Sequence, residues 1–339
     1  MMKYSFIIPV YNCEAHLPAC VESIRAAGLE DYEILLVDDG SADSSGAVCD
    51  ELAGKDPRVR AIHQPNGGVS AARNRGIWEA KGELVLFFDA DDTIDSAALG
   101  HILADSRCMQ ADLTIFGLTF DYYYKGRCYR RDPLFFEQEG ILERDSWCRE
   151  FARLYEKNSL SPVWNKVFRR DILVGHGLEL KGAMFLYEDL EFVLRYMAHC
   201  DAIFNVPQAI YHYRQSEDEG NAKRRLARID CLRDFLAPIE AAVNGLSGVP
   251  AEQREAVLVG LHQVLAREKL SGAGMKQTAK ICADYAGWYH DRGYTAGDNG
   301  FHRDLCGARA LKLMLRDRKS ALRHRIAVWA KAHHLYKRK

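Results

Sequence analysis

Residues 84–92 have the sequence LVLFFDADD, an apolar run that ends directly in a cluster of aspartates. A run of aliphatic and aromatic residues without polar alternation is typical of a strand that is buried on both faces of a parallel sheet. Ligands of open α/β sheets bind beyond the carboxyl ends of such strands. Three carboxylates this close repel one another unless a cation neutralises them, and Mg²⁺ and Mn²⁺ prefer oxygen ligands. The run therefore predicts either a metal site for a phosphate-bearing substrate or a solvated turn before a helix that begins near Asp95.

The residues on either side of this run alternate between strand and helix patterns. Strands are expected at residues 3–10, 32–37, 59–63, 84–88 and 113–124, and helices at 15–27, 44–52, 69–80 and around Leu99 and Leu103. Such regular alternation predicts an α/β fold with a doubly wound, mostly parallel sheet and right-handed crossovers. Residues 125–160 show no clear period and are expected to be irregular.

The rest of the chain has a helical pattern. Helices are expected at residues 224–243, 251–270, 276–290 and 304–337, separated by Gly and Pro. We therefore expect a sheet-containing domain over 1–215 and an α-helical C-terminal region over 216–339. The charge changes sign at the same place, because residues 1–215 hold 23 Lys/Arg and 33 Asp/Glu (−10), whereas 216–339 hold 23 and 14 (+9). The asymmetry indicates different roles for the two parts, catalysis for residues 1–215 and attachment for residues 216–339.

The composition is that of an ordinary globular protein. Hydrophobic residues make up 48% of the 339 positions and charged residues 27%, and no apolar stretch is long enough for a membrane span. The start lacks the features of a signal peptide. The ten cysteines are scattered without Cys-x-x-Cys pairs, which favours free thiols in a reducing cytoplasm over a zinc site. No nucleic-acid partner is expected.

Three further loops are predicted to reach the acid cluster. Residues 9–12 (PVYN) offer an aromatic ring to stack on a base and an amide that can cap the next helix. Residues 38–41 (DDGS) offer carboxylates that can bind a nucleobase or ribose hydroxyls. Residues 66–76 (NGGVSAARNRG) combine glycines, a helix N-terminus that favours an anion, and arginines that can reach phosphate. Each loop alone also fits ordinary turn chemistry.

The chain resembles the family 2 glycosyltransferases with a GT-A fold, because these motifs occur in the same order as in that family. They are Pro-x-Tyr-Asn, Asp-Asp-Gly-Ser, Asn-x-Gly-x-Ser-x-Ala-Arg-Asn and Asp-x-Asp-Asp, followed by the segments at 164–166, 187–189 and 211–214. The resemblance implies a Rossmann-like GT-A domain and an enzyme that moves a sugar from a nucleoside-diphosphate donor, such as a UDP-sugar, to an acceptor hydroxyl.

The resemblance also implies the donor site. Pro9, Tyr11 and Asp39 are expected to contact the base and ribose, and Asn66 and Arg73 to continue that site. The same site is expected to include Asn12, Asp38, Gly67, Asp89, Ala90 and, as a pyrophosphate contact, Arg214.

The metal and the base complete the expected chemistry. Asp91 is the preferred ligand of Mn²⁺ or Mg²⁺, and Asp89 is expected at the metal and at the ribose or sugar. Of Glu188 and Asp189, Asp189 is the preferred general base. One base with no second carboxylate as nucleophile predicts a single displacement that inverts the anomeric centre. Without the upstream motifs, residues 186–194 would instead be taken as an amphipathic helix with a charged outer face.

The sequence departs from the family at one point. Many relatives have a histidine shortly after the position of Arg214 that completes the metal site, and here residues 215–218 (QSED) lack one. His212 lies nearby in a different register, so a packed or hydrogen-bonded histidine is the preferred interpretation.

Two alternatives to this enzyme remain. A binding module could keep the nucleotide site without turnover, although the retention of Asp89, Asp91 and Asp189 argues against it. A nucleotidyltransferase would normally have a Gly-rich basic loop after the first strand, where this chain has residues 11–14 (YNCE).

The expected acceptor is a glycan or a lipid-linked oligosaccharide of capsule, exopolysaccharide or other cell-surface synthesis, by analogy with the family. Residues 318–339 contain eight Lys/Arg, three His and no acid, with Leu322, Ile326 and Trp329 at helical spacing. This pattern predicts a basic amphipathic helix on an anionic membrane, at the inner face of the plasma membrane, or a terminal helix packed on the acidic domain.

Overall fold

The computed structural model describes residues 2–124, 126–184, 186–215 and 232–272. The chain divides into two compact units. The first comprises Met1–Asp121, Arg131–Arg214 and Ala242–Arg254, and the second Tyr122–Arg130, Gln215–Ala241 and Glu255–Lys339. Every residue predicted for the donor site, the metal and the base lies in the first unit.

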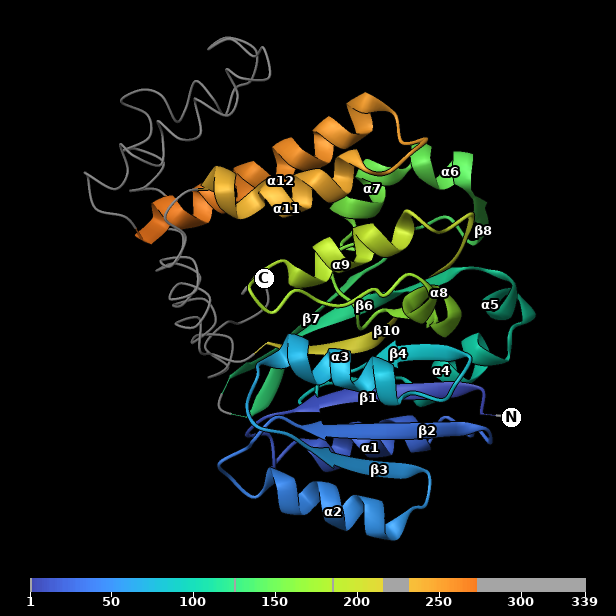
Figure 1. Ribbon diagram of the computed structural model, residues 1–339, viewed down its shortest axis with the longest axis vertical. Helices are drawn as coiled ribbons and strands as arrows, with labels where there is room; N and C mark the ends of the chain where they lie inside the picture. The colour runs from blue at the N-terminus through green and yellow to red at the C-terminus, as the bar shows by residue number, and fades with distance from the viewer. Residues whose placement is uncertain (1, 125, 185, 216–231, 273–339) are drawn as a thin grey trace, which may run out of the picture. The chain divides into compact units, whose positions relative to one another are not determined.

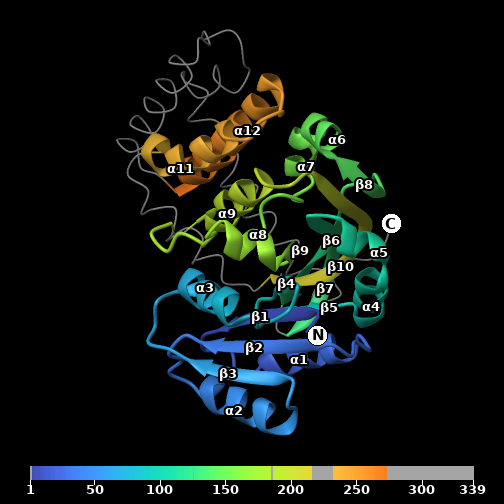
Figure 2. The same cartoon turned by 45° about the vertical axis from the view of Figure 1, so that its right-hand side comes forward.

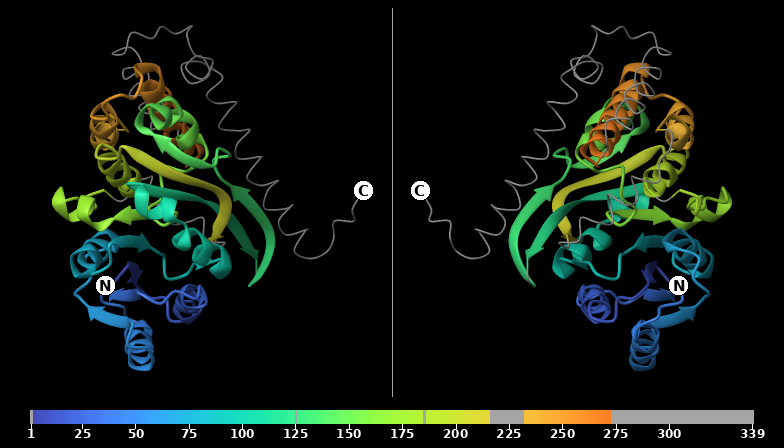
Figure 3. Two further views of the ribbon diagram at one scale, coloured as in Figure 1. Left: turned by 90° about the vertical axis from the view of Figure 1, so that its right-hand side faces the viewer. Right: turned by 90° about the vertical axis from the view of Figure 1, so that its left-hand side faces the viewer.

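A ten-stranded sheet organises the first unit (Figure 1). Its parallel part has the order β3-β2-β1-β4 and consists of β1 (Tyr4–Val10), β2 (Tyr32–Asp38), β3 (Val59–His63) and β4 (Leu84–Phe87). The order continues as β9-β6-β10-β5 through β9 (Lys166–Arg169), β6 (Leu113–Tyr124), β10 (Ala202–Gln215) and β5 (Thr93–Ile94). Two strands lie off this path, β7 (Arg127–Leu134) beside β6 and β8 (Gly140–Glu143) beside β10. Strand β10, yellow in Figure 3, is long and bends along its length.

Helices cover both faces of the parallel strands, with α1 (Leu17–Arg25) and α3 (Val69–Glu79) on opposite sides (Figure 2). Helix α1 contacts α2 (Ser45–Lys55) and α4 (Ser96–Ala104), whereas α3 contacts α8 (Arg170–Gly175). Helix α3 lies close to β1 because Gly76 has no side chain, and a Cβ there would stand 2.2 Å from Cγ2 of Ile7. The other described helices are α5 (Ser106–Gln110), α6 (Arg144–Arg149), α7 (Phe151–Glu156), α9 (Glu188–Met197), α11 (Leu232–Asn244) and α12 (Ala251–Gly272).

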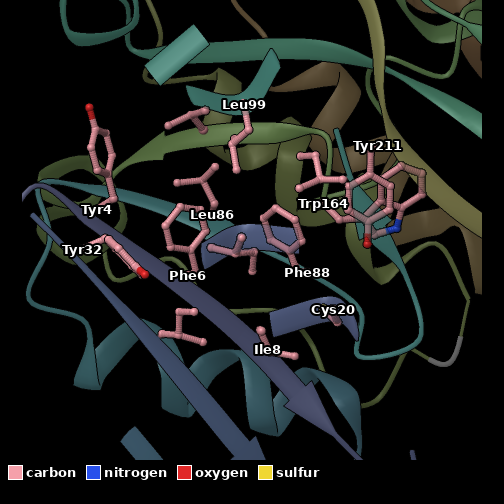
Figure 4. Packing of buried hydrophobic residues seen from close by; sticks show 14 of the residues in the cluster. Tyr4, Phe6, Ile8, Cys20, Tyr32, Leu86, Phe88, Leu99, Trp164 and Tyr211 are labelled. Carbon is pink, nitrogen blue, oxygen red and sulfur yellow. The ribbon is translucent and has the colours of Figure 1, made fainter. Parts of the chain in front are cut away.

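An aromatic row links the hydrophobic core to the carboxyl ends of the strands (Figure 4). The ring of Phe6 contacts that of Phe88 at 5.8 Å between centroids, and Phe88 contacts Tyr211 at 5.5 Å. Tyr211 in turn stacks on Trp164 at 4.2 Å with 16° between the ring planes. Aromatic contacts of this kind contribute about 0.5–1.5 kcal/mol each beyond their buried area. These contacts hold the end of β4 in a fixed position.

The predicted α/β fold is confirmed, and the predicted strands and helices of residues 3–124 occur within a few residues of their expected ends. The expectation of irregular structure over 125–160 is wrong, because this segment forms β7, β8, α6 and α7. These elements are short, and the two strands among them are held by pairing, β7 with β6 and β8 with β10, rather than indicated by a local period.

Three sequence predictions are not tested by the fold. The domain boundary near 216 stays a prediction, and the helices expected at 276–290 and 304–337 lie outside the described residues. The basic amphipathic segment 318–339 lies outside them too. Among the described residues, no helix is both long and apolar enough to span a membrane.

Candidate active site

The predicted site residues follow the carboxyl ends of three adjacent parallel strands. Strand β1 pairs with β2 on one side and with β4 on the other. The backbone N–H of Asp39, just after β2, donates to the carbonyl of Val10 at 2.9 Å. The strand ends therefore bring the loops after Val10, Asp38 and Phe87 to one edge of the sheet, as the sequence predicted.

Asp39 fixes the loop that leads into α3. Its buried carboxylate accepts hydrogen bonds from Nε2 of Gln64 at 2.8 Å and from the backbone N–H groups of Gly67 at 2.9 Å and Gly68 at 2.7 Å. Gly68, which precedes the first residue of α3, has φ of 87°, a conformation that strongly favours glycine. A carboxylate has about four acceptor positions. Three are used within the loop, which leaves about one for a ligand.

Asp38 holds the neighbouring turn and a histidine. Its Oδ1 accepts from the backbone N–H of Ser41 at 3.0 Å, and its Oδ2 lies 2.9 Å from Nδ1 of His63. Burial opposes the charge of Asp38, but the hydrogen bonds from Ser41 and His63 lower its pKa. The hydrogen bonds of His63 to Asp38 and to Asp50 raise the pKa of His63 above its ordinary value.

We expect His63→Gln to reduce stability at low pH and to change it little at high pH. A histidine with a raised pKa in the fold stabilises it fully below the unfolded pKa of about 6.5, and the contribution is lost as the pH rises through the folded pKa. Because 47% of the side chain is exposed, we expect a loss of only about 1–2 °C in Tm at pH 6. Thermal unfolding of both proteins at pH 6 and pH 9 measures it, and an equal difference at the two pH values would contradict the assignment.

The loop after β1 presents an aromatic ring. Tyr11 is 53% exposed, which leaves its ring accessible, while Pro9 is half-buried at the end of the strand. The expectation that the amide of Asn12 caps the next helix is wrong, since the cap position of α1 is His16. Asn12 has φ of 49°, and its Oδ1 accepts from the backbone N–H of Ala42 at 2.8 Å, so it joins the loops after β1 and β2 instead.

Arg73 joins the two acids on which the predicted chemistry depends. Its Nη2 donates to Oδ1 of Asp89 at 2.7 Å, and its Nη1 donates to Oδ1 of Asp189 at 2.7 Å, although these acids are 100 residues apart in sequence. The guanidinium side chain is only 4% exposed. Burial alone would lower the pKa of Arg73, but the charges of Asp189 and Asp89 raise it. The phosphate contact expected of Arg73 stays a prediction, and the structure shows its guanidinium bound to two carboxylates.

The three aspartates after β4 have different surroundings. Asp89 pairs with Arg73, whereas the carboxyl of Asp92 is buried, with its Oδ2 accepting from the hydroxyl of Tyr211 at 2.8 Å and its Oδ1 from the backbone N–H of Arg214 at 2.7 Å. Asp91 lies at the surface. Desolvation by the neighbouring protein and, second, the charge of Asp89 raise its pKa. Ala90, between Asp89 and Asp91, is buried.

Asp89 and Asp91 fit a hard divalent cation. The carboxyl of Asp91 is exposed and lies two residues from Asp89 in the same turn after β4, so both can offer oxygen ligands to a cation. Within the described ranges, no group of three or more His, Cys, Asp or Glu side chains is arranged to hold a metal. Mg²⁺ sites that use substrate phosphates typically take only one or two protein carboxylates, with waters for the rest. The donor set is therefore adequate for a cation that arrives with a diphosphate.

His212 lies beside an acid of β6. Its Nδ1 lies 3.3 Å from Oδ2 of Asp121, a buried acid that also pairs with Arg131. The preferred interpretation of His212 as a packed, paired histidine agrees with this contact. Arg214, two residues on, is positioned through its backbone N–H by Asp92.

Asp189 is the second residue of α9, and the segment before this helix is held in place by α3. Asn74 of α3 makes two hydrogen bonds to the backbone of Leu180, donating to its carbonyl at 2.9 Å and accepting from its N–H at 2.8 Å. Lys181 forms an ion pair at 2.6 Å with Glu191, which is buried on the first turns of α9. The alternative interpretation of residues 186–194 as an amphipathic helix is right about the secondary structure, because α9 begins with Glu188 and Asp189. A helix N-terminus favours such acids.

The surroundings of Asp189 suit a proton acceptor. Burial raises the pKa of Asp189 above its ordinary value, against the opposing charge of Arg73. Lys166 is fully buried, and its Nζ donates to Oδ1 of Asn165 at 2.7 Å. Burial holds the pKa of Lys166 well below the usual range, and the charge of Asp189 opposes that effect.

The sequence indicated several of these supporting residues without their roles. Trp164, Lys166, Tyr211 and Tyr213 belong to matching segments, and Asp92 belongs to the acid cluster, but pairing across distant segments was needed to show what each holds. Asn74 and Glu191 had no signal in the sequence beyond neighbouring a motif.

The chain is similar in sequence to known glycosyltransferases. Residues 5–174, half of the chain, match the model of glycosyl transferase family 2. The "Uncharacterized glycosyltransferase EpsJ" of Bacillus subtilis is 31% identical over 214 residues, which are 62% of this chain and 61% of EpsJ. The alignment thus leaves about two fifths of that relative uncovered.

Solved structures share the fold. A crystal structure of S. aureus TarS 1–349 in complex with UDP-GlcNAc has a TM-score of 0.62 at 20% identity, covering 85% of this chain and 81% of that one. The mannosyltransferase PcManGT from Pyrobaculum calidifontis, in complex with GDP-Man and Mn²⁺, has a TM-score of 0.53 at 14% identity, covering 97% and 84%.

Proposed function

We infer the reaction of this chain from its family: the chain belongs to glycosyl transferase family 2 and is a glycosyltransferase with a GT-A fold. We propose that it transfers a sugar from a nucleoside-diphosphate donor, a UDP-sugar in the first instance, to a hydroxyl of a glycan or lipid-linked acceptor, with inversion and with a divalent metal. The observation that supports this most is the Arg73 bridge, which sets the donor-side acid Asp89 and the base candidate Asp189 on one guanidinium.

The loops after β1, β2 and β3 are proposed to hold the nucleotide. The exposed ring of Tyr11 can stack on a base, and one free acceptor position of Asp39 can bind a base N–H or a ribose hydroxyl. Asn66 is well placed to extend this site, because its backbone nitrogen lies 3.0 Å from where a Cβ of Gly40 would be. Asp38, Asn12, Gly67 and Pro9 then shape these loops. Bound UDP-GlcNAc in TarS, the structural neighbour, supports a UDP-sugar as the first candidate.

Asp189 is proposed as the base that accepts the proton of the acceptor hydroxyl. A base works best when its pKa is near the working pH, and burial raises the pKa of Asp189 in that direction. Arg73 fixes the orientation of the carboxylate at 2.7 Å, and its charge keeps the carboxylate ionised enough to act. With a single carboxylate in this role, the acceptor oxygen attacks the anomeric carbon directly as the bond to the diphosphate breaks, so the configuration inverts.

Asp89 and Asp91 are proposed to hold Mn²⁺ or Mg²⁺ when a donor is bound, as the Mn²⁺ in the PcManGT complex suggests. The ion would neutralise the charge that develops on the leaving diphosphate. Arg214, positioned by Asp92, is proposed to contact the same diphosphate.

The test is a panel of UDP-GlcNAc, UDP-glucose, UDP-galactose and GDP-mannose, each with Mn²⁺ and with EDTA, on the full chain. We expect one of them to raise Tm by several degrees with Mn²⁺ and to release its nucleoside diphosphate slowly to water. NMR of the first-formed sugar should show the inverted anomer. Binding without release of diphosphate, at any metal concentration, would favour the non-catalytic binding module. Net retention would exclude the single displacement.

We expect Arg73→Lys to lower kcat by about 10²-fold or more while the fold persists. Lysine keeps the positive charge but cannot reach Asp89 and Asp189 together with two parallel donors. Steady-state kinetics of nucleoside-diphosphate release measure the loss, and circular dichroism checks the fold. Turnover within threefold of wild type would show that the bridge does not position the base.

Asn74→Ala is expected to lower kcat by about tenfold and stability by about 1–2 kcal/mol, because both backbone groups of Leu180 lose their partner. Asn74→Asp keeps an acceptor for the N–H of Leu180, so its kcat and stability should lie between those of wild type and Asn74→Ala. Binding of the bare nucleoside diphosphate should not change, since the loops after β1 and β2 are untouched. A loss of nucleotide affinity that parallels the loss of turnover would place Asn74 in the nucleotide site instead.

A further inference from the structure

One hydroxyl near the acid cluster has no role in the arrangement described so far, and it belongs to Tyr213 of β10. Its ring stacks on Trp164 at 5.2 Å with 12° between planes, and the edge of Phe120 lies against it at 5.9 Å. In the described part of the chain the hydroxyl takes part in no hydrogen bond, although the side chain is half-buried.

The direction of the Tyr213 side chain follows from that of Tyr211. Residues two apart on a strand project from the same face. Both tyrosines stack on Trp164, at 16° and 12°, so their rings are nearly parallel to each other. The hydroxyl of Tyr211 reaches the end of β4, where it donates to Asp92 at 2.8 Å and accepts from the backbone N–H of Asp89 at 3.1 Å. The ring of Tyr213 therefore lies on the same face of β10 as that of Tyr211 and against the same indole.

The electrostatics of Tyr213 agree with this direction. Burial raises its pKa first, and the charges of Asp89, Asp92, Asp91 and Asp189 raise it further, in that order. The phenol thus senses both the acids proposed for the diphosphate and metal and the acid proposed as base. A sugar in transfer must lie between these two groups.

We propose that Tyr213 binds the transferred sugar, with its phenol hydroxyl hydrogen-bonded to one hydroxyl of that sugar. The proposal rests on the glycosyltransferase function proposed above and makes Tyr213 a residue that selects the donor sugar. Stacking on Trp164 and the edge contact of Phe120 hold the ring, so the hydroxyl can discriminate between sugars that differ at one position. The neighbouring Tyr211 has a structural role instead, because its hydroxyl already hydrogen-bonds to the carboxylate of Asp92 and to the backbone N–H of Asp89.

The test compares the affinity of the donor with that of its bare nucleotide. Titration calorimetry with Mn²⁺ gives Kd for whichever of UDP-GlcNAc, UDP-glucose, UDP-galactose or GDP-mannose is turned over, and for UDP or GDP alone. In Tyr213→Phe we expect the nucleotide-sugar to bind about three- to tenfold more weakly, the loss of one neutral hydrogen bond. The bare nucleotide should bind within twofold of wild type. Equal effects on both, or none on either, would overturn the proposal.

Tyr211→Phe is the matched control, since it makes the same chemical change on the same strand. Because it removes a hydrogen bond that holds Asp92 and the backbone of Asp89, we expect it to lower Tm and to weaken nucleotide and nucleotide-sugar alike. If Tyr213→Phe behaved in this way, Tyr213 would be structural and the proposal would fail.

A second measurement changes the ligand and begins with the wild-type protein. Monodeoxy analogues of the active donor, each lacking one sugar hydroxyl, are titrated into the wild-type protein. One analogue should bind the wild type three- to tenfold more weakly than the parent donor does. Tyr213→Phe should bind that analogue and the parent with equal affinity. If no analogue binds more weakly than the parent, the proposal is overturned. If none of the four nucleotide-sugars binds or reacts with the wild type, the proposed function fails and the inference with it, whereas a donor that is turned over with no Tyr213 effect overturns the inference alone.

Discussion

Asp189→Asn should lower kcat by about 10²–10⁴-fold and leave the Kd of the nucleotide-sugar within a fewfold of wild type. Asparagine keeps the shape and can still contact Arg73, but it cannot accept the proton of the acceptor hydroxyl. Positioned general bases contribute about 10²–10⁴-fold to rate, and a loss confined to kcat is the signature of an interaction made in the transition state. Single-turnover kinetics with saturating donor and calorimetric titration measure the two quantities separately.

The matched control is Glu188→Gln, one residue earlier on the same helix turn. We expect it to change kcat by no more than a fewfold. If Glu188→Gln produced the large loss and Asp189→Asn did not, the base would be Glu188. A loss of donor affinity in Asp189→Asn that matched its loss of rate would instead assign Asp189 to binding or to structure.

The sequence predicted the parallel part of the sheet well because each of its elements has a local signal. Strand β4 has an unbroken apolar run, and α3 begins after a pair of glycines that its turn requires. The segment 125–160 has no such signal. Its strand β8 is fixed by pairing with β10, which lies far along the chain, whereas β7 pairs with β6, the strand directly before it.

The motifs predicted candidate site residues but not the hydrogen bonds among them. Arg73 could be predicted to reach an anion, yet the anions it reaches here are Asp89 and Asp189, and only the fold brings α9 to α3. The loop acid Asp39 was expected to face a ligand, and most of its hydrogen-bonding capacity holds Gly67 and Gly68. Contacts between segments about 100 residues apart depend on packing, and no local pattern encodes them.

Asp91→Asn should lower kcat by about 10²–10³-fold, and chelation of the metal should lower turnover of the wild type by a similar factor. Asparagine keeps the volume of the side chain and removes the charge that is proposed to hold Mn²⁺ or Mg²⁺. Losing one principal electrostatic group at a developing charge costs about 3–4 kcal/mol of transition-state stabilisation. The carboxyl of Asp91 is exposed and lies two residues from Asp89, so its oxygens are accessible to an ion that arrives with the diphosphate.

The matched control is Asp95→Asn, four residues further on and directly after β5. Asp95 caps α4 by accepting from the backbone N–H of Ala98 at 3.0 Å, and asparagine is an equally good cap, so stability and turnover should both stay close to wild type. Binding of Mn²⁺ is followed by electron paramagnetic resonance with UDP present, which gives a readout that does not depend on turnover. Asp91→Asn should weaken Mn²⁺ binding at least tenfold and Asp95→Asn should not. If EDTA-treated enzyme or Asp91→Asn kept near wild-type turnover, the leaving diphosphate would have to be neutralised by protein cations alone, with Arg214 as the first candidate, since its backbone is fixed beside Asp92.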